Sequence, residues 1–223
     1  MGNQSYILEV GDICDSCNNR FAKFEQKALS NTILAFERAK LGVQTKKKKN
    51  VKGEIQSLKF EGDKNYTKNK ITLFQHERSL LRPSDKGNNL FELEVPSFDK
   101  SPVPTSKLLL KIGIESIYKS RRKLYNLYNF KELKEYLRNE SNKDWPFITN
   151  TIQVSESIDI PRYTDKYNLT KIKCKLKVKE RNNSTLIFNL KYGSISLAIN
   201  LLSRNFDWIK EYNDWTVYPE RLR

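Results

Sequence analysis

The sequence has a single histidine, His76, and three cysteines, Cys14, Cys17 and Cys174, among its 223 residues. One histidine excludes any mechanism that needs two histidines within the chain. Three cysteines provide no disulfide framework, which indicates a reducing compartment. No apolar run approaches the roughly 20 residues of a membrane-spanning helix, and the first residues lack the basic start and apolar stretch of a signal peptide. We therefore expect a cytoplasmic protein with no membrane partner.

Acidic residues are scarce relative to basic ones. The chain has 41 Lys and Arg against 26 Asp and Glu, which gives a formal net charge of +15 and a pI near 9.6. This surplus makes a polyanion, most simply nucleic acid, the leading candidate partner. An anionic membrane surface also fits the charge, but no amphipathic helix rich in lysine and apolar bulk supports it.

Hydrophobic residues make up 38% of the chain and aromatic residues 11%, enough for the core of one large domain or two small ones. Helical periodicity is found in three segments: 19–41, 105–124 and 131–138. Strand patterns are found in the segments 53–60, 70–74 and 90–95, and in an antiparallel meander over 171–202. Three prolines mark a candidate internal boundary at 96–104. The fold class is therefore α+β.

Cys14 and Cys17 are separated by two residues at the point where the first predicted helix begins. A Cys-x-x-Cys turn lets two thiolates bind one zinc ion at about 2.3 Å, but a structural zinc site usually has four protein ligands. The pair supplies half of such a site, and the pattern also fits two ordinary cysteines in a loop that opens a helix. A redox pair is less favoured, because no βαβ pattern surrounds the motif.

The stretch Gly-Asp-Ile-Cys-Asp-Ser-Cys-Asn-Asn-Arg-Phe-Ala-Lys-Phe-Glu at 11–25 resembles the C-terminal half of an HNH endonuclease module. The similarity is to the variety with two Cys-x-x-Cys zinc knuckles. It extends over the N-terminal segment only, where Gly2-Asn3 takes the place of the family's turn and Tyr6-Ile7-Leu8 that of the following strand. It implies a partial ββα-metal module over 1–45, followed by a mixed helical and antiparallel-sheet domain over 46–223.

The resemblance also implies an activity, a metal-dependent DNA endonuclease, and a role for each matching residue. Cys14 and Cys17 would be the second pair of ligands to a structural zinc ion. Asn18 would point at a catalytic Mg²⁺ or Mn²⁺ ion from the start of the helix, and Glu25 would be the acidic residue further along it. The cationic side chains that would flank a scissile phosphate are Arg20, Lys23 and Lys27.

The sequence departs from the family pattern upstream of this segment. The family's catalytic histidine and its first cysteine pair would precede Gly2, so the chain lacks the base that activates water for phosphodiester hydrolysis. We expect His76, in a polar segment far past the module, to be an exposed residue. Three alternatives stay open: a start further upstream, a fragment that a partner chain or self-association completes, and a non-catalytic nucleic-acid-binding protein derived from such a nuclease.

Lysine alternates with apolar residues over 171–179, which predicts a strand with one cationic and one apolar face. The cationic face, which includes Lys173, Lys175 and Lys177, has two interpretations. The lysines could follow a phosphate backbone, because alternate residues of a strand lie close to 7 Å apart, or they could protect an edge strand against aggregation. Cys174 belongs to the apolar face and is expected to be a buried thiol.

Two further basic clusters are candidate contacts for nucleic acid. Arg121 and Arg122 stand at the end of a predicted helix, where they could also interact with the helix dipole. The four lysines at 46–49 are best interpreted as part of a solvated loop. A non-specific contact to phosphate is the second interpretation.

Overall fold

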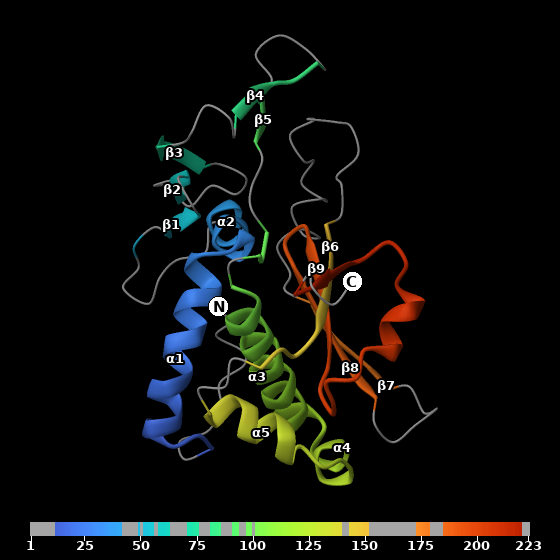
Figure 1. The fold of residues 1–223 in the computed structure, drawn as a ribbon. Helices are drawn as coiled ribbons and strands as arrows, with labels where there is room; N and C mark the ends of the chain where they lie inside the picture. The colour runs from blue at the N-terminus through green and yellow to red at the C-terminus, as the bar shows by residue number, and fades with distance from the viewer. Residues whose placement is uncertain are drawn as a thin grey trace.

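A five-stranded antiparallel sheet forms the centre of the structure, and helices cover one of its faces (Figure 1). We describe the protein from a computed structural model. The structure describes residues 12–41, 49, 51–55, 58–62, 71–75, 81–85, 91–93, 97–99, 101–139, 143–151, 173–178 and 185–219. The expectations for Gly2-Asn3, Tyr6-Ile7-Leu8 and His76 lie outside these residues.

The helices follow the chain in the order α1 (Asp15–Ser30), α2 (Ile33–Lys40), α3 (Pro102–Ser120), α4 (Arg122–Leu127), α5 (Lys131–Arg138) and the 3-10 helix η2 (Asp207–Glu211). The strands of the large sheet are β6 (Phe147–Thr151), β7 (Lys173–Val178), β8 (Leu186–Tyr192), β9 (Ile195–Asn200) and β10 (Thr216–Tyr218). The smaller sheets consist of β1 (Lys52–Ile55), β2 (Leu58–Gly62) and β3 (Ile71–Gln75), and of β4 (Leu81–Pro83) and β5 (Phe91–Leu93). The mixed α+β class predicted from the sequence is confirmed.

The large sheet has the strand order β10-β6-β9-β8-β7, with every pair antiparallel. Successive residues of β8 pack on opposite faces, because side chains alternate along a strand. Phe188 belongs to the main core under the helices, whereas Ile187 packs against Trp208 of η2 on the other face. The sheet is therefore buried on both faces.

The main core lies between the large sheet and the helices α1, α3 and α5. Helix α1 buries Phe21, Phe24 and Ala28, which share this core with residues of α3 and of the sheet. Full burial of each large apolar side chain contributes about 1.5–3 kcal/mol to folding. Residues 15–30 are thus packed into the same core as residues beyond 101, across the division at 45 that the resemblance suggested.

The helix predicted over 19–41 is two helices, and the prediction of one continuous helix is wrong. Thr32 ends the first and begins the second: its hydroxyl donates to the Ala28 carbonyl at 2.6 Å and accepts from the Leu34 N–H at 3.2 Å. A threonine side chain at an N-cap satisfies helix-end groups in this way. Helix α1 also begins at Asp15, earlier than predicted, so that Cys17 lies within its first turn.

The proline-rich boundary predicted at 96–104 is partly helical. Helix α3 begins at Pro102, and proline is well suited to the first turn because it has no N–H to leave unbonded. Thr105, the first residue of the predicted helical segment, instead lies inside α3 and donates its hydroxyl to the Ser101 carbonyl at 2.8 Å. The same helix ends at Ser120, and Arg121 separates it from α4.

The strand predictions are confirmed in the C-terminal meander, where β7, β8 and β9 follow the predicted segments. Helix α5 occupies the predicted residues 131–138. The segment expected to be one strand over 53–60 is instead the hairpin of β1 and β2. Strands β6 and β10 and the 3-10 helix η2 were not predicted.

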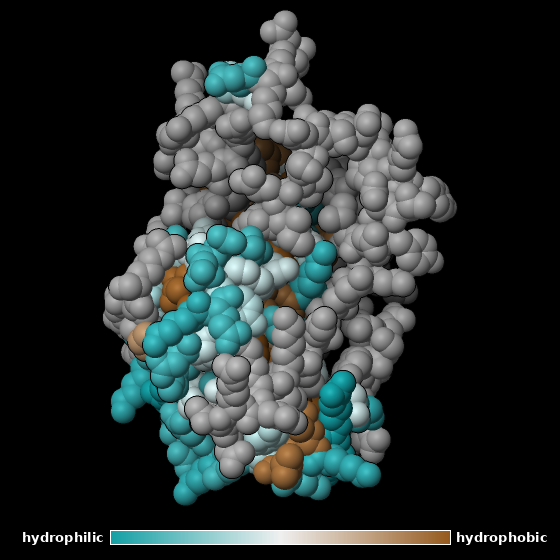
Figure 2. Space-filling view, turned by 90° about the vertical axis from the view of Figure 1, so that its right-hand side faces the viewer, coloured by the Kyte–Doolittle hydropathy of each residue, from teal (hydrophilic) through white to brown (hydrophobic). Residues whose placement is uncertain are grey.

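The described surface is largely hydrophilic. In Figure 2, which shows the right-hand side of Figure 1, hydrophobic residues form small separate areas among the coloured atoms. The large hydrophobic side chains that are exposed, Phe74, Leu127 and Phe206, come from three separate segments. Among the described helices, none has both the length and the apolar composition that crossing a bilayer requires.

Candidate functional site

The start of α1 places two cysteines side by side at the surface. Cys14 is the N-cap residue, with an extended backbone, and its Sγ accepts the Cys17 N–H at 3.4 Å. The Cys14 carbonyl accepts the Asn18 N–H at 2.9 Å, which is the first bond of the helix. The sulfur therefore performs the capping role that a serine or aspartate oxygen usually has.

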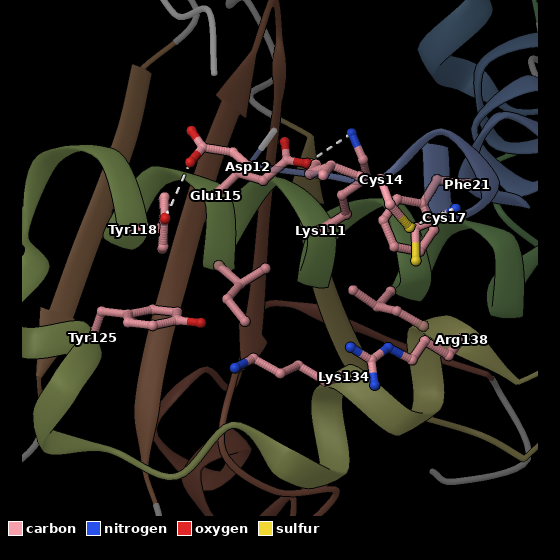
Figure 3. A pocket seen from close by; sticks show the side chains of 13 residues that line it. Asp12, Cys14, Cys17, Phe21, Lys111, Glu115, Tyr118, Tyr125, Lys134 and Arg138 are labelled. Carbon is pink, nitrogen blue, oxygen red and sulfur yellow. Dashed lines mark hydrogen bonds and ion pairs between the residues drawn. The ribbon is translucent and has the colours of Figure 1, made fainter. Parts of the chain in front are cut away.

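The environments of the two thiols differ. Cys14 is exposed, and hydrogen bonds from the Ser16 hydroxyl and from Cys17 lower its pKa to about 7. Cys17 is half-buried and packs against the main core; its hydrogen bond with Cys14, followed by burial, raises its pKa. Figure 3 shows the two sulfur atoms next to each other at the edge of a pocket.

The pocket beside these cysteines has a volume of about 390 Å³ and lies between the start of α1 and the helices α3, α4 and α5 (Figure 3). Its walls combine apolar, aromatic and charged side chains. The lining residues are Asp12, Ile13, Cys14, Cys17, Phe21, Lys111, Ile114, Glu115, Tyr118, Tyr125, Lys134, Leu137 and Arg138.

An ion-pair network joins α1 to α3 at one side of the pocket. Lys111 Nζ lies 2.8 Å from Glu25 Oε1 and 2.9 Å from Glu115 Oε1. Burial alone lowers the pKa of Lys111, but the two carboxylates outweigh it, and the net pKa is raised. Burial raises the pKa of Glu115, against the opposing effect of Lys111. Glu25 is thus ion-paired within the protein, with 31% of its side chain exposed.

Cations stack on aromatic rings at the opposite side of the pocket. The guanidinium carbon of Arg122 lies 3.7 Å from the centroid of the Tyr118 ring, and Lys134 Nζ lies 5.0 Å from that of Tyr125. In the described part of the chain, no carboxylate forms an ion pair with Arg122, Lys134 or Arg138. Their charge is therefore available to an anionic ligand.

A second hollow adjoins the pocket on the outside of α4 and α5. It has a volume of about 490 Å³ and shares Tyr125, Lys134 and Arg138 with the pocket. Lys131 and Asn126 extend it along the surface. The two depressions together combine aromatic rings with basic side chains and with three acidic ones, Asp12, Glu115 and Glu135.

The residues predicted to act on a phosphate lie on or near this surface. Arg20 is exposed and its guanidinium donates to the Arg138 carbonyl, which fixes α1 beside the end of α5. Lys23 and Lys27 are exposed further along α1. Arg122 stacks on Tyr118, and Arg121 is exposed between α3 and α4.

The lysine-rich strand is β7, and it is an edge strand of the large sheet. Its register places Lys173, Lys175 and Lys177 opposite Lys191, Asn189 and Ile187. The edge position agrees with the interpretation that lysines protect the sheet from aggregation. The side chains of β7, including Cys174, lie outside the described residues.

The donors present do not fit the metals that the resemblance implies. Cys14 and Cys17 provide two zinc ligands, and within the described ranges no third His, Cys, Asp or Glu joins them in a group. Asn18 is exposed at the start of α1, while Glu25 is paired with Lys111. Neither a tetrahedral zinc site nor a Mg²⁺ site is assembled here by the described residues.

Apart from Arg122, sequence reasoning missed the side chains that α3, α4 and α5 contribute to the site. The spacing of Lys111 and Glu115, four residues apart, signals a helical ion pair, but not its contact with Glu25. The stacking of Arg122 and Lys134 on tyrosines depends on how the helices pack. A comparison of the chain with protein-family models, with curated proteins and with solved structures found no match.

Proposed function

We propose that the chain is a non-catalytic nucleic-acid-binding protein. Binding takes place on the surface formed by α1, α4, α5 and the end of α3, which we call the α4–α5 surface. Its members are Arg20, Tyr118, Arg122, Tyr125, Lys131, Lys134 and Arg138.

The observation that carries this proposal is the pairing of cations with aromatic rings beside an open hollow. Arg122 and Lys134 are held against Tyr118 and Tyr125, and no described carboxylate neutralises them. Phosphates bind arginine and lysine side chains, and the two tyrosine rings hold these cations in place; the Tyr125 ring is itself stacked on Phe130. The net charge of +15 supplies the long-range attraction.

Cleavage of the bound strand is not part of the proposal. Hydrolysis needs a base for the attacking water and a metal or cation at the phosphate. Glu25, the acidic residue that the resemblance assigned to catalysis, is bound to Lys111 at 2.8 Å. The proposed function is therefore binding of the strand without cleavage.

The test is binding of fluorescently labelled single-stranded and duplex DNA oligonucleotides, followed by anisotropy over a series of salt concentrations. The triple variant Arg122→Gln, Lys134→Gln, Arg138→Gln should weaken binding and reduce the slope of log K against log salt by about 2 to 3, because each phosphate contact contributes about 0.7–0.9.

A charge-matched variant controls for net charge alone. Lys52, Lys59 and Lys210 have exposed side chains on β1, β2 and η2, away from the α4–α5 surface. Changing these three to glutamine should leave the slope nearly unchanged. Equal losses in the two triple variants would mean that no specific surface binds the nucleic acid.

A further inference from the structure

The proposed binding of nucleic acid assigns no role to the two cysteines at the start of α1. Cys14 is exposed on the N-cap, and Cys17, one turn later, is half-buried against the core. The Cys17 backbone N–H donates to Cys14 Sγ, and the sulfur atoms lie side by side in Figure 3. We propose that Cys14 and Cys17 form a dithiol that exchanges with small anionic disulfides.

The position on the helix assigns a role to each thiol. The Cys17 N–H points at Cys14 Sγ, at 3.4 Å, from the first turn of a 16-residue helix. Helix N-terminal N–H groups stabilise negative charge on a sulfur. Cys14 is therefore the attacking sulfur, and Cys17 is the resolving sulfur, placed within reach behind it.

The adjacent pocket points to the substrate class. Both cysteines line this cavity of about 390 Å³, together with the apolar side chains of Phe21 and Leu137. Lys134 and Arg138 enter it from α5, below the cysteines in the view of Figure 3. The carboxylates that also line it, Asp12 and Glu115, are bonded to the Tyr118 hydroxyl and to Lys111. A disulfide with carboxylates on either side would place its sulfurs at Cys14 and its carboxylates at these two cations.

The exchange balances in two steps. The Cys14 thiolate attacks one sulfur of the substrate RS–SR, the S–S bond breaks, and RS⁻ leaves with the electron pair and takes up a proton. Cys17 then loses its proton and attacks the Cys14 sulfur of the mixed disulfide, which expels the second thiol. The dithiol has lost two electrons and two protons, and the substrate has become two thiols. A dithiol reductant reverses the cycle.

The experiment uses the full chain in buffers of oxidised and reduced glutathione, followed by acid quenching, alkylation and mass spectrometry of tryptic peptides. We expect a Cys14–Cys17 disulfide that forms with one midpoint and is reversed by dithiothreitol. Cys17→Ser should stop at a glutathione adduct on Cys14. Cys14→Ser should form neither product, and serine keeps the N-cap, so its helix content by circular dichroism should match the parent.

Cys174→Ser is the matched control and should leave the cycle unchanged. Adducts distributed over all three cysteines without an internal disulfide would overturn the proposal. Stoichiometric zinc held by the two sulfurs of the purified protein, and released when they are alkylated, would also overturn it. DNA binding by the α4–α5 surface is measured separately with Cys14→Ser, so the failure of one proposal is distinguishable from the failure of the other.

Discussion

The carboxylate of Glu37 accepts two hydrogen bonds from Ser194, one from its backbone N–H and one from its hydroxyl, each at 2.9 Å. Glu37 lies in α2 and Ser194 lies in the turn between β8 and β9. Glu37 is only 2% exposed, and Lys40 balances its charge at 2.8 Å. This contact fastens the second helix to the tip of the large sheet.

Gly193→Ala should destabilise the protein strongly. Gly193 has a φ of 60°, and a Cβ at this position would lie 1.9 Å from Glu37 Oε2. The backbone strain alone costs about 1–3 kcal/mol, and displacement of the carboxylate adds to it. Urea unfolding measures the loss. Gly62→Ala is the control, because its Cβ would lie no closer than 3.4 Å to another atom.

Glu37→Gln should lower the free energy of unfolding by about 1–3 kcal/mol, because an amide NH₂ would face a donor in place of a carboxylate oxygen. Lys40→Met tests the charge separately and should cost less, since the two bonds from Ser194 remain. A smaller effect for Glu37→Gln than for Lys40→Met would show that the ion pair, not the contact with the turn, holds α2.

Lys111→Met should destabilise the protein by about 2 kcal/mol at neutral pH, less than the 3–5 kcal/mol for a fully buried pair, because the carboxylates keep some exposure. Without the ammonium, Glu25 and Glu115 repel each other and the pKa of Glu115, already raised by burial, rises further. When folding raises the pKa of a carboxyl group, the folded state binds a proton more tightly than the unfolded state does. The resulting stabilisation is complete below the unfolded pKa and is lost as the pH rises through the folded pKa.

The loss of stability caused by Lys111→Met should therefore become smaller as the pH falls from 7 toward 4.5, the ordinary pKa of glutamic acid. Thermal unfolding at a series of pH values measures this. The double variant Lys111→Met, Glu115→Gln should recover part of the lost stability at pH 7, and a deficit that is constant with pH would contradict the role of the network.

Alkylation of Cys14 by iodoacetamide should be half-maximal near pH 7, because the thiolate reacts and the pKa of this thiol is lowered to about 7. Ser16→Ala removes the largest cause of the lowering and should move the midpoint upward, toward the ordinary value of 9.0. Cys17 should react more slowly at every pH in this range. An unchanged midpoint in Ser16→Ala would assign the shift to the helix end and Cys17 alone.

Plasmid DNA should remain supercoiled on incubation of the chain with Mg²⁺ or Mn²⁺, since the described residues bring no metal-binding group to Asn18. Asn18→Ala should bind DNA as the parent does. Cleavage that is lost in Asn18→Ala would show that the chain is a nuclease, as the resemblance to the HNH module implied.

The parts of the fold that the sequence predicted well are those with strong local patterns. The segment that forms β7 alternates regularly between lysine and apolar residues, and α5 concentrates its apolar residues on one side, so both were located correctly. The break at Thr32 was missed because the apolar periodicity continues through it. The Thr32 hydroxyl accepts the Leu34 N–H in place of a helical carbonyl. Strand β6 was missed because its five residues, Phe-Ile-Thr-Asn-Thr, alternate too briefly to be distinguished from a loop.

The candidate site was predictable only at α1 and at Arg122. Cys14 and Cys17 were recognised by their spacing, but their place on the helix depends on where α1 begins. Glu25 forms an ion pair with Lys111, which is far along the chain, and no local sequence pattern predicts that contact. Long-range packing determines which charges neutralise each other, and short sequence motifs do not predict it.

Strand β6 pairs with β10 along one edge and with β9 along the other. Both partners come from the last part of the chain, and β10 spans Thr216–Tyr218. During synthesis, Phe147 and its neighbours therefore leave the ribosome long before either partner strand exists. Completion of the sheet must wait until residues 216–218 have left the ribosome, and a chain truncated before residue 216 would leave one backbone edge of β6 unpaired.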